Sequence, residues 1–236
     1  MEPRVFKIEE EHRPKASLTI STDACLGGPG KVHFFSLGPY TDISPERYDC
    51  PALYIGAGGQ ADFVLGGGRE QDVRKKATGC ARGNKPFCPA WLEKGGILFV
   101  PGGMLCGMKA RETGFVYTEI LMEKETKMNE ILKPAEVFCL KDLIDYEKGS
   151  IANMDLATGS SANLMILSFD EGCALAEHRA PGDALLFALE GKAVIGYEGR
   201  DYAIREGENF RFEKNGLHSV KADGRFKMAL LLMLEG

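Results

Sequence analysis

The amino-acid sequence predicts an all-β protein, and three of its features lead to this prediction. Its apolar segments are short and are bounded by Gly, Pro, Asn and Asp, which is typical of antiparallel strands in a sandwich or a barrel. The chain also repeats its own pattern at a nearly constant spacing, and few segments have helical periodicity. These features alone do not distinguish one kind of barrel from another.

The expected strands, in chain order, include Ala52–Ile55, Ile97–Val100, Leu164–Phe169, Ala184–Leu189 and Lys192–Tyr197. Glu198-Gly199 directly follows the last of these segments, and a further strand-like segment begins at Asp201, so a β-hairpin is expected there. The segment Val137–Tyr146 carries apolar residues at helical spacing, which predicts a short helix. The segment Lys124–Leu132 is expected to link the two halves of the chain.

The two halves of the chain match each other. At an offset of 132 residues the matches are Val5-Phe6 with Val137-Phe138, Ser36 with Ser168, Arg47 with Arg179, Ala52-Leu53 with Ala184-Leu185, and Gly59 and Ala61 with Gly191 and Ala193. Beyond a break the offset becomes 112, so the first half contains an insertion of about 20 residues near 66–91. We therefore expect two copies of one domain, at 1–130 and 131–236.

Composition and charge exclude several classes of protein. The net charge of −5 and the pI near 5.5 give no basic surface of the kind that nucleic-acid binding needs. The N-terminal residues show no secretory signal, and the longest apolar run, Met228–Leu234, is too short to span a bilayer. Seven scattered cysteines without a Cys-x-x-Cys pair argue against a disulfide framework or a zinc site. We expect a cytoplasmic protein without nucleic-acid or membrane partners.

Two histidines of the second half stand in recognisable settings. The first motif runs from Gly172 through His178 to Gly191, with a turn at Pro181-Gly182 and an apolar strand after it. The second motif joins Gly207 to His218. In their spacing the two motifs resemble the signature motifs of the cupin family. The chain as a whole therefore resembles a bicupin, and the resemblance implies two double-stranded β-helix barrels in tandem with a few short helices.

Both motifs depart from the family pattern. In the first motif, Ala180 replaces the second histidine and Ala184 replaces the glutamate, so two of the four usual metal ligands are missing. In the second motif, Glu213, Asn215 and Ala222 replace a proline, a glycine and an asparagine. These replacements affect the chemistry of the site more than they affect the fold.

The resemblance implies that His178 and His218 point at one another inside the mouth of the second barrel. Imidazole is a common ligand of transition metals, so the pair could hold a divalent ion (Zn, Ni, Fe or Mn), which the incomplete ligand set would bind weakly. Because two ligand side chains are lost, we expect a wider and more apolar pocket walled by Phe187, Phe212 and Met228. Such a pocket favours a partly apolar organic ligand.

The first half has no histidine at the matching positions. Glu46, Tyr48, Ala52 and Cys106 occupy them, and this set is not a recognised metal site, so we expect a degenerate barrel that binds no metal. The insertion is basic, with Arg69, Arg74, Lys75, Lys76, Arg82 and Lys85. It is read as a solvated loop, with a lid over a barrel mouth or an arm to a partner subunit as alternatives.

Three hypotheses about function follow from the sequence. The leading one is a small-molecule-binding bicupin whose site lies in the C-terminal barrel. The alternative is a cupin enzyme of the isomerase or epimerase, decarboxylase or dioxygenase type, which would use metal-assisted or acid–base chemistry. The third is a non-catalytic structural or regulatory module. The two barrels are expected to pair within one chain or in a homodimer, because barrels of this kind bury their open edges.

Overall fold

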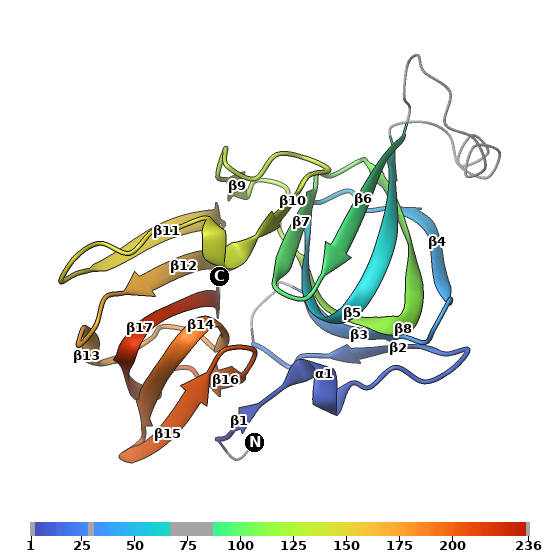
Figure 1. Ribbon diagram of the computed structural model, residues 1–236. Coiled ribbons are helices and arrows are strands. Elements are labelled where there is room, and N and C mark those ends of the chain that lie inside the picture. The colour runs from blue at the N-terminus through green and yellow to red at the C-terminus, as the bar shows by residue number, and fades with distance from the viewer. Residues whose placement is uncertain (1–2, 28–30, 67–86, 235–236) are drawn as a thin grey trace.

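The computed structural model describes residues 3–27, 31–66 and 87–234, which form two antiparallel sheets, each curled into a barrel (Figure 1). The first sheet has eight strands: β2 (Thr19–Asp23), β3 (Lys31–Leu37), β4 (Asp42–Arg47), β5 (Ala52–Gly66), β6 (Phe87–Glu93), β7 (Gly96–Val100), β8 (Leu105–Leu121) and β10 (Val137–Cys139). The second has nine: β1 (Val5–Phe6), β9 (Lys127–Met128), β11 (Ile151–Thr158), β12 (Ala162–Phe169), β13 (Ala174–Arg179), β14 (Ala184–Tyr197), β15 (Arg200–Arg205), β16 (Asn209–Phe212) and β17 (Leu217–Met233). Helical turns within the described ranges are α1 (Ile8–Glu11) and the 3-10 turn η1 (Leu140–Asp142).

The all-β prediction is confirmed, and the expected strands lie within β5, β7, β12 and β14. Ala184–Leu189 and Lys192–Tyr197 are two parts of the single strand β14, whose pairing with β17 is irregular on both sides of Gly191. The expected hairpin is also present, since Tyr197 pairs with Arg200 across a two-residue turn. The two turn residues have positive φ angles of 48° and 77°, as the turn of a tight hairpin requires.

The prediction of a helix at Val137–Tyr146 is wrong apart from one turn. Val137–Cys139 forms β10, which pairs with β7, and η1 follows it directly. The apolar spacing that suggested a helix instead places Leu140 and Ile144 in the core between the barrels. Pairing with a distant strand has overridden the local periodicity, as it often does in short segments. The expected linker at Lys124–Leu132 includes β9, which pairs with β11 of the second barrel.

The expected insertion lies between β5 and β6, and its residues 67–86 fall outside the part of the chain that the structure describes. Its roles as a loop, a lid or an arm therefore stay predictions. The five cysteines that the structure describes in full, Cys25, Cys50, Cys106, Cys139 and Cys173, are free thiols. Within the described residues no helix is long and apolar enough to cross a membrane.

The strand register follows the repeat found in the sequence. In the first barrel, Glu46 on β4 pairs with Cys106 on β8. In the second barrel, His178 on β13 pairs with His218 on β17, at positions 132 and 112 residues later. The two barrels therefore place these four residues at corresponding points of the same architecture.

The register also identifies equivalent residues deeper in each barrel. Tyr54 on β5 pairs with Glu119 on β8, whereas Leu186 on β14 pairs with Leu230 on β17. The offset has become 111 at this point, because the irregular turn within β17 is one residue shorter than the turn within β8. Glu119 in the first barrel thus corresponds to Leu230 in the second.

The two halves exchange their first strands. β1 belongs to the first half of the sequence but pairs with β16 of the second barrel, where Val5 lies opposite Phe210. β10 belongs to the second half but pairs with β7 of the first barrel, where Val137 lies opposite Leu98. Figure 1 shows both strands at the junction of the barrels. The boundary between the sheets therefore does not coincide with residue 130. The division into domains at 1–130 and 131–236 describes the sequence repeat and stays a prediction.

The barrels also share an apolar core. Each barrel has its own interior cluster, and a third cluster fills the space between the barrels with side chains from both. Ile8 of α1 and Leu140 of η1 occupy equivalent places in this third cluster and are 1% and 0% exposed. Leu53 on β5 and Leu185 on β14 add to it from the two barrels. Intramolecular pairing of the barrels, which the sequence led us to expect, is thus present in the chain.

We expect Ile8→Ala and Leu140→Ala each to lower the free energy of unfolding by about 2–5 kcal/mol, because each removes a fully buried aliphatic side chain from the shared cluster. Leu18→Ala is the matched control: Leu18 is 49% exposed, and its truncation should cost much less. Urea denaturation followed by circular dichroism measures all three. Costs below 1 kcal/mol for both buried positions would contradict a common core between the barrels.

Candidate functional site

His178 and His218 face each other across the paired strands β13 and β17, and their ring centroids are 4.3 Å apart. His218 is buried, with 5% of its surface exposed, whereas His178 is exposed to solvent. Each Nδ1 atom lies 2.9 Å from a backbone carbonyl oxygen, that of Ala176 for His178 and that of Gly216 for His218. A neutral imidazole that donates through Nδ1 keeps Nε2 as its acceptor. The pair therefore presents two Nε2 atoms that can accept a hydrogen bond or bind a metal.

The environment favours the neutral form of the buried histidine. Burial lowers the pKa of His218, and the hydrogen bond to the Gly216 carbonyl, which acts in the opposite direction, does not reverse this. The neighbouring His178 lowers the pKa of His218 further. His218 therefore stays available as an acceptor in mildly acidic solution, where an ordinary histidine begins to gain its proton.

Of the three expected pocket residues, Phe212 lies against the histidine pair. The ring of Phe212 lies 4.4 Å from that of His218, and Met228 belongs to the same interior cluster as Phe212. Phe187 is elsewhere: it points out of the barrel into the core between the barrels, because neighbouring residues of a strand face opposite sides. Tyr197 takes part in the same interior cluster and stacks edge-on against Phe212, with centroids 5.8 Å apart.

Two carboxylates of the motif region, Asp183 and Glu190, are engaged elsewhere. Asp183 accepts hydrogen bonds from the backbone amides of Gly27 and Lys214, at 3.0 and 2.7 Å, and pairs with Arg211. Glu190 accepts a hydrogen bond of 2.8 Å from the hydroxyl of Tyr146. In the described part of the chain, no group of three or more His, Cys, Asp or Glu side chains is arranged to hold a metal ion. The histidine pair thus has no third protein ligand there.

A second group of ionisable side chains lies inside the first barrel. Glu119 is only 4% exposed, and its Oε2 atom lies 3.7 Å from Nδ1 of His33. The hydroxyls of Tyr48 and Tyr54 hydrogen-bond to its carboxylate. Cys106, which sequence analysis assigned to the degenerate motif, is buried beside them and interacts with Tyr54.

This environment perturbs the acids strongly. Burial raises the pKa of Glu119 to about 7, although the hydrogen bonds from Tyr48 and Tyr54 act to lower it. Burial likewise raises the pKa of the Cys106 thiol to about 12. The pKa values of Tyr48 and Tyr54 are raised well above the usual range, chiefly by burial. Near neutral pH, the carboxyl of Glu119 therefore exists in both its protonated and its ionised form.

Sequence reasoning missed this group because it compared only the positions of the two motifs. A signal was present in the segment Phe115–Leu121, where Glu119 is a charged residue within an apolar strand. Glu119 and Tyr117 are two residues apart in the strand, so both side chains lie on its inner face. A buried carboxyl group without a cationic partner nearby in the sequence is the feature to look for in such a strand.

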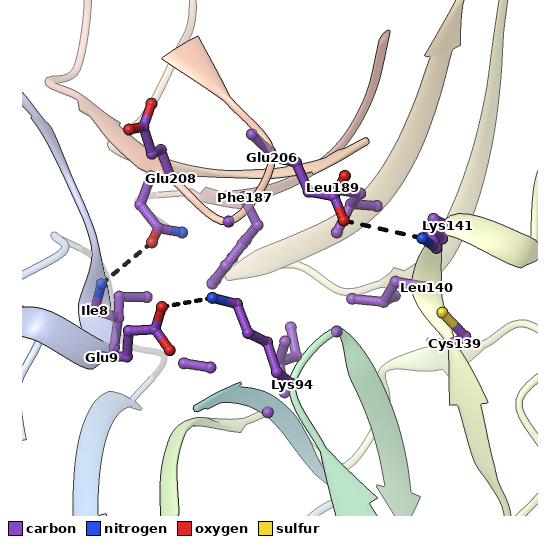
Figure 2. A pocket seen from close by; sticks show the side chains of 17 residues that line it. Ile8, Glu9, Lys94, Cys139, Leu140, Lys141, Phe187, Leu189, Glu206 and Glu208 are labelled. Atoms are coloured by element: carbon purple, nitrogen blue, oxygen red, sulfur yellow. Dashed lines mark hydrogen bonds and ion pairs between the residues drawn. The ribbon is translucent and has the colours of Figure 1, made fainter. Parts of the chain in front are cut away.

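A cleft of about 270 Å³ lies between the barrels, close to the exchanged strands (Figure 2). On one side Lys94 pairs with Glu9 at 2.5 Å, and on the other Lys141 lies 3.9 Å from Glu206. The two ion pairs occupy equivalent positions of the repeat with their charges reversed, and Phe187 contributes an apolar wall between them. Because these four charged groups already have partners, the cleft is best explained as the junction of the barrels.

Comparison with known proteins shows what this architecture is similar to. Residues 165–234 match the family model described as a cupin domain. A cupin 2 conserved barrel domain protein from Leptotrichia buccalis superposes with a TM-score of 0.79 at 22% sequence identity, covering 99% of this chain and 98% of that one. Salicylate 1,2-dioxygenase from Pseudoaminobacter salicylatoxidans, in a structure with gentisate adducts, gives a TM-score of 0.65 at 13% identity, covering 98% of this chain and 81% of that one. A search of curated proteins found no match. At these identities the two structures establish the fold.

We expect Glu119→Gln to stabilise the protein at alkaline pH. The pKa of Glu119 is about 7 in the folded state, and the ordinary value of 4.5 applies to the unfolded chain. The folded state therefore loses stability as the pH rises from 4.5 to 7. Above pH 8 the cost is on the order of 3 kcal/mol, which the amide avoids. Chemical denaturation between pH 4.5 and 8.5 should therefore show an advantage of the variant that grows with pH. Glu112→Gln, at an exposed position of the same strand, is the control, and a difference independent of pH would contradict the assignment.

We also expect Cys106→Ser to leave the metal content of the protein unchanged. A thiol binds metal as the thiolate, and the Cys106 thiol, with its pKa near 12, stays protonated. Elemental analysis after dialysis against zinc measures the metal bound per chain for wild type and variant. Loss of bound zinc in the variant would show that the first barrel holds metal through this residue.

Proposed function

Since the chain has a cupin fold over its whole length and carries a cupin domain at 165–234, we propose that it binds a small organic molecule at the histidine pair of the second barrel. The observation that carries this proposal is the pairing of His178 with His218, each with Nδ1 on a backbone carbonyl and Nε2 left as an acceptor. Two converging polar groups against an apolar wall are typical of a small-molecule site.

The difference in exposure between the two rings indicates the side from which a ligand would enter. His178 is open to solvent and His218 is buried against Phe212, so a ligand would approach past the first ring and reach the second. An apolar part of the ligand would contact Phe212, while a hydroxyl or N–H group would donate to an Nε2 atom. This arrangement supports a partly apolar ligand with a hydrogen-bond donor.

The residues do not fit a tightly held metal ion. Catalytic metal sites in proteins commonly use three protein ligands and keep one position open. Here His178 and His218 supply two imidazoles, and the described residues place no third His, Cys, Asp or Glu with them. A divalent ion such as Zn, Ni, Fe or Mn would therefore need donors from water or from the organic ligand, and its binding would be weak and ligand-dependent.

We expect isothermal titration of metal-free protein with zinc, nickel, manganese and iron(II) to show weak binding that His218→Ala reduces at least tenfold. Acetohydroxamate, a small bidentate oxygen donor, should tighten metal binding to the wild type because it supplies the missing ligands. It should have no such effect on the variant. The measurement compares the dissociation constants with and without acetohydroxamate.

His12→Ala is the control, because His12 lies against Phe34 and does not face the pair. Its affinity for each metal should equal that of the wild type. Equal affinities of wild type and His218→Ala would contradict a role for the pair in metal binding. If acetohydroxamate does not discriminate between the two proteins either, the pair does not hold a metal with the help of an organic ligand.

A further inference from the structure

We propose that the interior of the first barrel is a second, separate binding site, and that it takes a small organic cation, a protonated amine, on the carboxylate of Glu119. This site is independent of the histidine pair. Its polar groups are His33, Tyr48 and Tyr54 around Glu119. The strands β3, β5 and β8 bring His33, Tyr54 and Glu119 together, and Tyr48 reaches Glu119 from the loop that follows β4. The sequence motifs led us to expect only a structural barrel here.

The fold itself does not require these polar side chains. The second barrel is the internal comparison: Met165, Leu186 and Leu230 occupy the positions of His33, Tyr54 and Glu119. All three are apolar, and the barrel closes around them without difficulty. Burying a carboxyl group in an apolar interior costs stability, so its presence in one barrel and absence from the other indicates a role other than packing.

The group around Glu119 is incompletely satisfied. The Nδ1 atom of His33 is buried and has no hydrogen-bond partner, and its distance of 3.7 Å from the Glu119 carboxylate is too long for a hydrogen bond. Buried polar atoms in folded proteins are usually paired with protein, water or ligand. A bound molecule between these two side chains would supply the missing contacts.

The outer members of this group are partly exposed to solvent. His33 and Phe35 point into the barrel, toward Glu119 and Tyr117, yet both are only half-buried. Tyr48 is also half-buried, and Glu46 next to it along the rim of the barrel is exposed. The cluster therefore extends from the surface to the buried carboxylate.

The charges select the class of ligand. Glu119 and the nearby Glu46 are acids, whereas the phenols of Tyr48 and Tyr54 and the thiol of Cys106 stay neutral. An anion would be repelled by this set and a cation attracted. The Tyr117 ring, which stacks on Phe35 at 5.0 Å and lies 5.8 Å from Tyr54, would give an apolar contact to the carbon chain of such a cation.

Binding of a cation must be linked to the protonation of Glu119. The groups that face this carboxyl are Glu46, Tyr48, Tyr54, Cys106, His33 and Tyr117, and the buried carboxyl is half-protonated near pH 7. An ammonium ion favours the ionised carboxylate, so its affinity should rise as the pH increases through this value. Binding should also lower the pKa of Glu119.

The test uses n-propylammonium as the probe, with protein labelled with ¹³C at the glutamate side-chain carboxyl carbon. NMR titration at pH 8.5 and at pH 5.5 follows both probe binding and the ionisation of Glu119. We expect saturable binding at pH 8.5, at least tenfold weaker binding at pH 5.5, and a lower pKa for the Glu119 resonance with the probe present. Propionate, an anion of similar size, should not bind.

Variants locate the site. Glu119→Gln should weaken propylammonium binding at pH 8.5 at least tenfold, and Tyr48→Phe, a milder change at the rim, should weaken it severalfold. Glu112→Gln, which is exposed on the same strand, and His218→Ala, which alters the other barrel, should leave it unchanged. Undiminished binding in both Glu119→Gln and Tyr48→Phe, equal binding of propionate, or no saturable binding to the wild type at pH 8.5 would each overturn the proposal.

Discussion

Each barrel depends on the pairing of two long, bent strands. β5 pairs with β8 along nearly its whole length, and β14 pairs with β17 in the same way. Both strands of each pair bend at irregular pairings, so one continuous ladder passes around the barrel and brings distant residues to the same mouth. In the second barrel the ladder positions His218; in the first it positions both Cys106 and Glu119. The chemistry of both sites is therefore set by register, and a shift of one residue would turn each of these side chains to the other face.

Most of the fold could be predicted from the sequence because its signals are local or repeated. The Glu198-Gly199 turn, the apolar segments and the offset between the halves all report backbone requirements that tertiary structure does not change. The helix expected at Val137–Tyr146 failed for the opposite reason: its first residues pair with β7, which lies about 40 residues earlier in the chain. The exchange of β1 and β10 could not be predicted either, because strands of two and three residues carry no signal about their partners.

Some residues of the candidate sites could be predicted from the sequence, and others could not. His178 and His218 come together as their motif positions implied, since register within the barrel places them, and Phe212 lies against His218 as expected of a pocket wall. Phe187 does not join them, because it lies three residues after Ala184, which faces the barrel interior, so strand alternation turns Phe187 to the outer face. The carboxyl of Glu119 was overlooked because its significance depends on burial and on Tyr48, which lies far from it in the sequence. Two copies of one architecture have thus kept their backbone and diverged in the polar side chains of their interiors.

The reciprocal placement of β1 and β10 bears on how the chain is assembled during synthesis. The first sheet lacks an edge strand until residues 137–139 have left the ribosome, and β1 waits for its partner until β16 at 209–212 has been made. Neither barrel can finish as an isolated unit while the chain grows, although domains commonly fold one after another from the N-terminus. Closure of both barrels and their docking on each other then become late, coupled events, and the pairings of high sequence separation make them slow.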